Sequence, residues 1–177
     1  MKKRLTAPFL SADDLSALRD LRTGDSVLLS GVIYTARDAA HQRLLGLLAK
    51  GEALPFDLRG AAIYYCGPTP APPGRPVGSI GPTTSYRMDS FAPALYERGL
   101  AASIGKGPRG AAVKEALCQS GGVYFAATGG AAALLASCVK EAKLIAFPDL
   151  GPEAVYELKV EDFPLLVATD AQGGDLY

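Results

Sequence analysis

The sequence predicts an α/β domain in which helices flank a mixed central sheet. Apolar stretches of strand length alternate with helical patterns along most of the chain, and the last two strand-like stretches follow each other directly. Residues 26–34 are largely apolar, which is typical of a strand buried on both faces of a parallel sheet. The chain has 177 residues, of which 49% are hydrophobic, so it can form a substantial core. We therefore expect a single domain over residues 1–177.

The expected elements follow in a regular order. An edge strand should begin near residue 5, followed by a turn or short helix at 11–15. The other expected strands are 26–34, 61–66, 100–104, 123–127, 144–147 and a closing antiparallel pair, 154–160 and 165–169. Helices are expected after residue 38, where Ala40, Leu44, Leu47 and Leu48 form one apolar stripe, and at 91–97, 109–119 and 131–138. Thr35–Asp38 resembles a capping box, Asp89 and Ser90 are candidate N-caps, and the proline-rich stretch 67–76 should be a surface loop.

Charge and composition exclude several classes of protein. The formal net charge is zero, so there is no electrostatic basis for binding nucleic acid or an anionic membrane surface. No segment approaches the roughly 18 apolar residues of a membrane-spanning helix. The start, Met1–Leu5, is basic but lacks the apolar run of a signal peptide. We expect a cytoplasmic protein.

The three cysteines are far apart and include no Cys-x-x-Cys pair (Cys66, Cys118 and Cys138). This scattered set does not suit a disulfide framework or a self-contained metal site. Cys66 and Cys138 are expected to be buried structural thiols. An iron–sulfur cluster usually needs about three cysteines at one site, so this chain should not hold one unaided.

Residues 78–89 combine a shaped turn with anion-binding chemistry. Two glycines and a proline are followed by three hydroxyl residues and then by Arg87, just ahead of the expected helix 91–97. Hydroxyl groups and a guanidinium before a helix N-terminus suit a carboxylate. A turn that only caps the helix fits the local residues equally well.

Three cationic positions are expected at one edge of the sheet. Arg37, the Thr83–Arg87 loop and Lys106 each fall where a strand passes into a helix, and ligands of α/β sheets bind at the carboxyl ends of the strands. Two arginines, a lysine and a hydroxyl group could together bind a small molecule with two carboxylates.

Two further motifs admit more than one interpretation. Gly105–Gly110 matches the spacing of a dinucleotide-binding loop, but the acidic residue expected about 20 positions later is missing. His41 is the only histidine. Asp38 lies one helical turn earlier and could orient it for acid–base chemistry, or His41 could simply tie the first helical turn to a neighbouring loop.

Four motifs, taken in order, resemble the β subunit of class I fumarate hydratase and the related tartrate dehydratase β subunit. They are Tyr34–His41, Gly81–Met88, Ile104–Gly107 and Asp170–Tyr177. The resemblance runs from about residue 5 to residue 177 and implies a swivelling β/β/α domain. It also implies that Arg37, Thr83, Arg87 and Lys106 bind the substrate, that Thr83 transfers a proton, and that His41 is a further catalytic candidate.

The same resemblance implies a partner and a cofactor. An α subunit would hold a [4Fe-4S] cluster whose free iron acts as a Lewis acid on the substrate hydroxyl. The assembly would be a hetero-oligomer, or a homodimer, that hydrates fumarate to malate. Dehydration of tartrate to oxaloacetate is the nearest alternative. A non-catalytic dicarboxylate-binding module and a stand-alone nucleotide binder are hypotheses of other classes.

Overall fold

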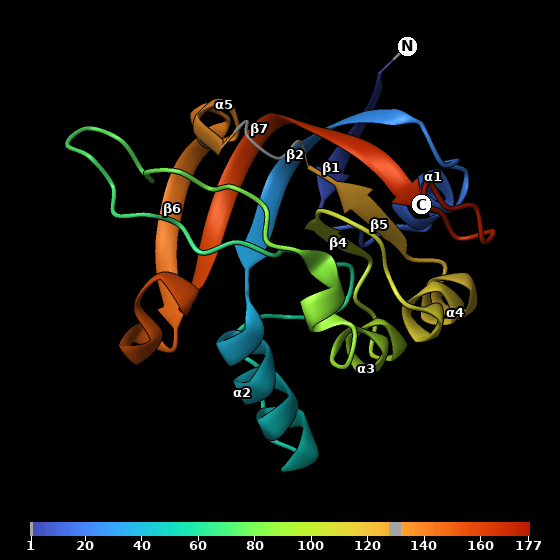
Figure 1. Ribbon diagram of the computed structural model, residues 1–177, viewed down its shortest axis with the longest axis horizontal. Coiled ribbons are helices and arrows are strands. Elements are labelled where there is room, and N and C mark those ends of the chain that lie inside the picture. Colours follow the sequence, from blue (N-terminus) through green and yellow to red (C-terminus); the bar gives the residue numbers. More distant parts are fainter. Residues whose placement is uncertain (1, 128–131) are drawn as a thin grey trace.

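In the computed structural model, which describes residues 2–127 and 132–177, seven strands form one mixed sheet that closes on itself (Figure 1). The order is β1-β2-β3-β4-β5-β7-β6, and an additional pairing of β2 with β7 closes a barrel of β2, β3, β4, β5 and β7. Strands β1 to β5 pair in parallel, whereas β7 runs antiparallel to β2, β5 and β6. The strands are β1 (Lys3–Ala7), β2 (Ser26–Thr35), β3 (Ala62–Tyr64), β4 (Ala102–Gly105), β5 (Val123–Ala126), β6 (Val139–Ala146) and β7 (Val155–Thr169).

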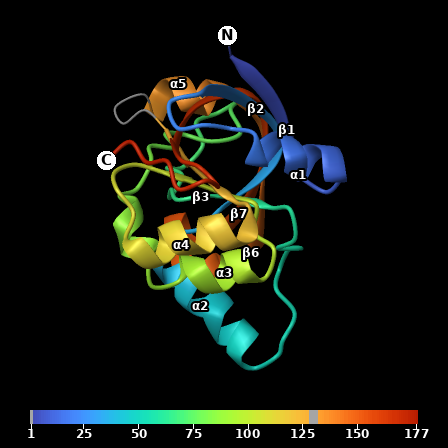
Figure 2. The same ribbon diagram turned by 90° about the vertical axis from the view of Figure 1, so that its right-hand side faces the viewer.

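The helices complete a mixed α/β fold, as the sequence predicted. Three of them, α2, α3 and α4, lie together against one side of the barrel, and α5 lies at the opposite end (Figures 1 and 2). The helices are α1 (Ala12–Arg19), α2 (Asp38–Ala49), α3 (Ala92–Glu97), α4 (Ala111–Ser120) and α5 (Ala132–Ser137), with 3-10 helices η1 (Ser85–Met88) and η2 (Pro148–Glu153). The stretch Thr128–Gly130, expected to open a helix, lies outside the described residues.

Alternating side chains of the central strands separate two hydrophobic cores. In β3, Ala62 and Tyr64 face the barrel interior, while Ile63 packs against the helices. The same alternation continues in β4 and β5, so Ser103 and Tyr124 point toward the helix side, where they are register partners. Polar side chains on these strands are therefore buried beneath the helices rather than exposed.

The predicted closing hairpin is wrong. Residues 155–169 form one strand, and its antiparallel neighbour is β6, which begins earlier than the predicted stretch 144–147. A positive φ of 50° at Asp162 bends β7 without ending it. Pro164 is the register partner of Leu28 in β2, and neither β5 nor β6 pairs with β7 at this position, so one side of the strand is free of a ladder there.

The predicted helix caps are also wrong, because their side chains bond to other elements. The Thr35 hydroxyl accepts a hydrogen bond from the Tyr156 amide at 3.1 Å, and α2 begins without a side-chain cap. Asp89 does not cap α3; its Oδ2 accepts from the Gly110 amide at 2.6 Å, at the start of α4. A capping box is present instead at α1, where Ser11 and Asp14 bond reciprocally.

Candidate active site

The carboxyl ends of β2, β3 and β4 lie side by side at one edge of the barrel. Thr35 is the register partner of Tyr64, and Tyr64 is the partner of Ile104. Arg37 follows β2 by two residues, and Lys106 directly follows β4. Adjacent parallel strands therefore bring the backbone of Arg37 and Lys106 to the same edge.

Main-chain hydrogen bonds hold the Thr83–Arg87 loop at this edge as well. The Thr83 amide donates to the Tyr65 carbonyl at 2.6 Å, and the Ser85 amide donates to the Lys106 carbonyl at 2.9 Å. Thr84 and Lys106 also form an isolated parallel bridge. Thr83, Arg87 and Lys106 thus come from two loops whose backbones are in direct contact.

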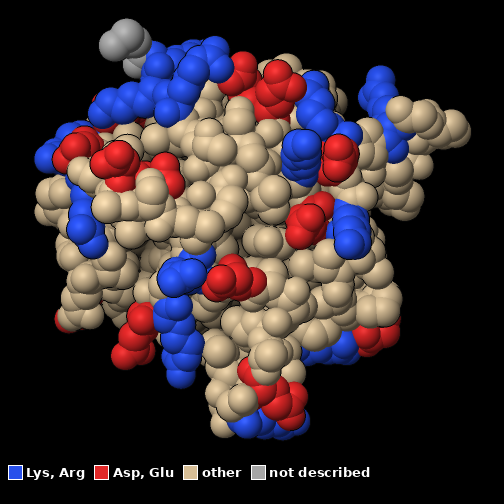
Figure 3. Space-filling view, turned by 180° about the vertical axis from the view of Figure 1, so that it is seen from behind, with Lys and Arg blue, Asp and Glu red and all other residues tan. Residues whose placement is uncertain are grey.

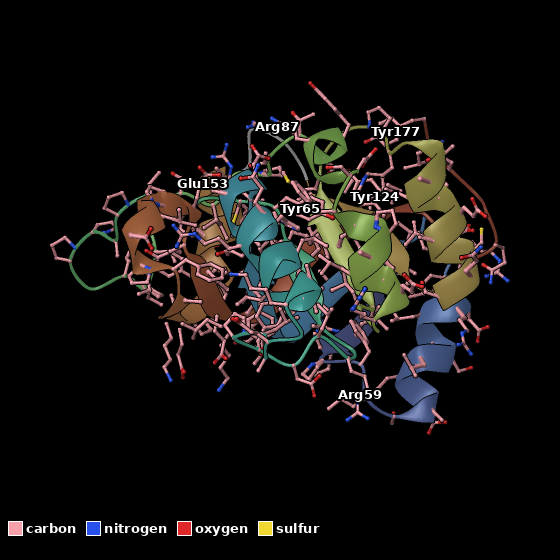
Figure 4. The ribbon with its side chains drawn as sticks, turned by 90° about the horizontal axis from the view of Figure 1, so that it is seen from below. Arg59, Tyr65, Arg87, Tyr124, Glu153 and Tyr177 are labelled. Atoms are coloured by element: carbon pink, nitrogen blue, oxygen red, sulfur yellow. The ribbon has the colours of Figure 1, made fainter. Side chains whose placement is uncertain are left out.

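Carboxylates hold both arginines at this edge. Arg87 forms an ion pair with Asp38, the first residue of α2. Arg37 directly precedes Asp38, and its Nε lies 3.8 Å from Glu153 Oε1 at the end of η2. Arg87 and Glu153 lie near each other along one edge in Figure 4, whereas Arg59 lies at the opposite edge. Both arginine side chains remain partly exposed, at 29% for Arg37 and 44% for Arg87.

Buried polar atoms without hydrogen-bond partners concentrate at the same place. Among the described residues there are five such side-chain atoms, and four of them belong to Arg37, Asp38, His41 and Glu153. Buried polar groups in native proteins are nearly always bonded to protein, water or a ligand. Two of the four atoms, Arg37 Nε and Glu153 Oε1, face each other in the ion pair described above, so the concentration marks the polar cluster around the two arginines.

His41 is buried behind these residues rather than exposed beside them. Its Nδ1 lies 2.8 Å from the Arg37 carbonyl, so Nδ1 carries the proton and donates, and Nε2 is left as an unbonded acceptor. The ring packs against Tyr65 and Phe91, with centroids 5.4 and 5.6 Å away. Burial lowers the pKa of His41 to about 4, so the imidazole is neutral at pH 7.

The depressed pKa of His41 predicts a pH dependence of stability. The unfolded chain binds a proton near the ordinary pKa of 6.5, whereas the folded chain resists it down to about 4. The contribution of His41 to the free energy of unfolding is therefore fully present above pH 6.5. It is lost as the pH drops toward 4, by roughly 3 kcal/mol in total. Urea unfolding of wild type and of His41→Asn, which keeps a donor for the Arg37 carbonyl, measures this. The variant should lose less stability than wild type between pH 6.5 and 4. An equal dependence of the free energy of unfolding on pH in the two proteins would contradict the lowered pKa of His41.

The predicted site lies at an edge of the barrel, and a sizeable groove lies elsewhere. A groove of about 620 Å³ runs between α3 and α4, lined by Pro93, Tyr96, Glu97, Gly99, Ala112, Glu115, Ala116, Gln119 and Ser120. None of its lining residues is a predicted site residue. On the face seen from behind in Figure 3, uncharged residues dominate the middle, and basic and acidic side chains lie mostly around it.

The Gly105–Gly110 loop does connect a strand to a helix, β4 to α4, but its anion-binding groups already have partners. The Gly110 amide, at the start of α4, donates to Asp89, and the Arg109 Nε donates to the same carboxylate at 2.7 Å. A pyrophosphate would have to displace this carboxylate. The geometry therefore argues against the nucleotide-binding hypothesis.

The described residues offer no ligand set for a metal. No group of three His, Cys, Asp or Glu side chains among them could hold an ion. Cys66 is buried, Cys138 half-buried and Cys118 exposed, and burial raises the pKa of the Cys66 thiol.

Within the described residues, no helix combines the length and apolar character needed to cross a bilayer.

Sequence reasoning missed Asp38 and Glu153 as partners of the arginines, and it missed Arg109. The sequence around Asp38 indicates a helix cap or a partner for His41, and it carries no local signal of the ion pair with Arg87. Glu153 comes from η2, more than a hundred residues from Arg37, and no local pattern connects the two.

The chain belongs to the fumarase C-terminal domain family. The family model described as Fumarase C-terminus matches residues 8–177. Fumarate hydratase 2 of Leishmania major is 40% identical over 156 residues, covering 87% of this chain and 28% of that protein. The anaerobic class I fumarate hydratase of Escherichia coli is 38% identical over 165 residues, covering 92% of this chain and 30% of that protein.

A relative of similar length carries a different name. The putative L(+)-tartrate dehydratase subunit beta of Methanocaldococcus jannaschii is 43% identical over 166 residues, covering 90% of this chain and 85% of that protein. The chain thus spans less than a third of the two fumarate hydratases but most of this subunit. The resemblance read from the four motifs is confirmed at the level of the family.

Proposed function

We propose that this chain is the β subunit of a two-subunit hydro-lyase that reversibly hydrates fumarate to malate. The observation that supports this most strongly is that the backbones of Arg37, Arg87 and Lys106 meet at one edge of the barrel, where the two arginine side chains remain partly exposed. Membership in the fumarase C-terminal family and a length close to that of a named β subunit support the division into two subunits.

In this proposal the chain binds and polarises the substrate. Arg37, Arg87 and Lys106 bind the two carboxylates. The proton removed next to a carboxylate is weakly acidic, so negative charge develops on that carboxylate in the transition state. Fixed cations at this position stabilise the developing charge, and electrostatic preorganisation of this kind is commonly the largest catalytic contribution. Asp38 and Glu153 keep both guanidinium groups oriented before substrate arrives.

Thr83 is the proposed proton-transfer group and substrate contact, because its backbone is fixed to Tyr65 at the edge where the cations gather. For His41, burial and a pKa of about 4 favour an indirect role in catalysis. In this role, Nδ1 donates a hydrogen bond to the carbonyl of Arg37 and fixes its position. The [4Fe-4S] cluster is proposed to reside on the partner α subunit. The free thiols of this chain suit a reducing, cytoplasmic compartment.

Tartrate dehydration to oxaloacetate is the second candidate, because the relative named for it matches this chain over most of both lengths. Both substrates are dicarboxylates and need the same cations. A non-catalytic dicarboxylate-binding module would use the same edge without turnover.

Co-expression with the partner subunit and an anaerobic assay test the proposal. The cluster-loaded protein is assayed with fumarate, malate, both tartrates and citramalate. We expect rapid interconversion of fumarate and malate and much slower turnover of the other substrates. Preferred turnover of one tartrate would select the second candidate. Binding of a dicarboxylate without turnover of any substrate would contradict the enzyme and support the binding module.

A further inference from the structure

Arg109 is buried beneath the candidate active site, in the same loop as Lys106. Its side chain is fully shielded from solvent. A buried guanidinium is costly unless its donors are bonded. Burial alone would lower the pKa of Arg109, but Tyr65, Tyr96 and Asp89 raise it overall, so the group stays charged.

Each part of the guanidinium bonds to a different element. Nε donates to Asp89 Oδ1 at 2.7 Å, Nη1 to Ser103 Oγ at 3.1 Å and Nη2 to the Tyr65 hydroxyl at 3.2 Å. The same group lies over the rings of Tyr65 and Tyr124, 5.2 and 4.8 Å from their centroids. Asp89 directly follows η1, and Tyr65 is the residue whose carbonyl holds the Thr83 amide.

Tyr124 forms a second link between the same two loops. Its hydroxyl hydrogen-bonds with Ser85 Oγ and with the Gly107 carbonyl, each at 2.8 Å. Ser85 begins η1, which contains Arg87, and Gly107 directly follows Lys106. Figure 4 shows Tyr65 and Tyr124 behind the edge that carries Arg87.

We propose that Arg109 and Tyr124 are positioning residues that lock the Thr83–Arg87 loop to the Lys106 loop and so set the spacing of the dicarboxylate site. The inference rests on the proposed function. Arg87 and Lys106 are exposed side chains, one in η1 and one just after β4, so their relative placement depends on the layer beneath them. Misplacement of a reacting group by about 1 Å costs on the order of 10²-fold in rate. A planar guanidinium presents its donors in fixed directions over a wide span, and the compact ammonium of a lysine does not reproduce that geometry.

The test uses Arg109→Lys and Tyr124→Phe in the complete protein with its partner subunit. Arg98→Lys and Tyr34→Phe are the matched controls: Arg98 is exposed in the chain, and the Tyr34 hydroxyl makes no side-chain hydrogen bond within the described residues. We expect kcat/KM to fall about 10-fold for Tyr124→Phe and about 100-fold for Arg109→Lys, with unchanged controls.

Amide hydrogen exchange supplies a readout that does not depend on turnover. Residues 83–90 and 105–110 should exchange faster together in both variants, while β2 and β7 remain as protected as in wild type. Folded variants with wild-type kcat/KM would overturn the inference, as would faster exchange spread evenly over the chain. If Arg109→Lys does not fold, Tyr124→Phe alone decides. A wild-type protein inactive on every dicarboxylate would overturn the proposed function and this inference with it, whereas an active wild type with unaffected variants overturns only the inference.

Discussion

Replacing Arg87 by alanine is expected to lower kcat/KM for the dicarboxylate substrate by about 100-fold or more. The substitution removes a cation from the substrate and also removes the ion-pair partner of Asp38. An unpaired carboxylate then remains beside the position of an anionic ligand, which adds repulsion to the lost attraction. Arg37→Ala should have an effect of similar size, because it leaves Glu153 without its partner. Steady-state kinetics of the cluster-loaded protein measure both.

Two controls separate a site effect from a general loss of charge. Arg59→Ala removes an exposed arginine at the opposite edge of the molecule and should leave kcat/KM unchanged (Figure 4). Arg87→Lys keeps the charge but cannot form two parallel hydrogen bonds to a carboxylate. Its kcat/KM should therefore lie between those of Arg87→Ala and wild type. If Arg87→Ala and Arg59→Ala have the same effect, Arg87 does not bind substrate.

Gly105→Ala is expected to have the second large effect, through the backbone. A Cβ at this position would overlap Ser85 Oγ, lie 2.9 Å from Tyr65 Cδ2 and lie 3.2 Å from the Thr83 carbonyl oxygen. The methyl group would push the Thr83–Arg87 loop away from Lys106. We expect a loss of about 1–3 kcal/mol in the free energy of unfolding, typical of overpacking, and a fall in kcat/KM of about 100-fold.

Gly46→Ala is the matched control for this prediction. Gly46 lies inside α2, where an added Cβ meets no atom within 4 Å. Alanine should therefore stabilise the protein by about 0.5–1 kcal/mol and leave kcat/KM unchanged. Urea unfolding and kinetics of the two variants side by side measure the contrast. Wild-type activity in Gly105→Ala would contradict the close contact between the two loops.

The order of strands and helices could be predicted from the sequence because local patterns determine it. The apolar run 26–34 and the helical stripe with Ala40 and Leu44 became β2 and α2 almost within their predicted bounds. The closing hairpin could not be recognised correctly, because a bend at Asp162 and a turn give similar sequence signals. Closure of the barrel depends on pairing between β2 and β7, which lie far apart in the sequence.

The site shows the same division between local and long-range information. Arg37, Thr83, Arg87 and Lys106 could be singled out because each lies between an expected strand and an expected helix. Main-chain contacts bring their backbones to one edge of the barrel. Arg109 was missed because its importance comes from burial against Tyr65, Tyr124 and Asp89, which belong to other parts of the chain. The network around a buried charge is a property of packing and has no signature in a single segment.

A crystal structure of the complete protein with a bound dicarboxylate tests the central claim most directly. The account predicts carboxylate oxygens within about 3 Å of Arg37, Arg87 and Lys106, and the Thr83 hydroxyl next to the carbon that loses or gains a proton. A dicarboxylate bound at another surface, with Arg87 still paired only to Asp38 and Arg37 only to Glu153, would contradict it.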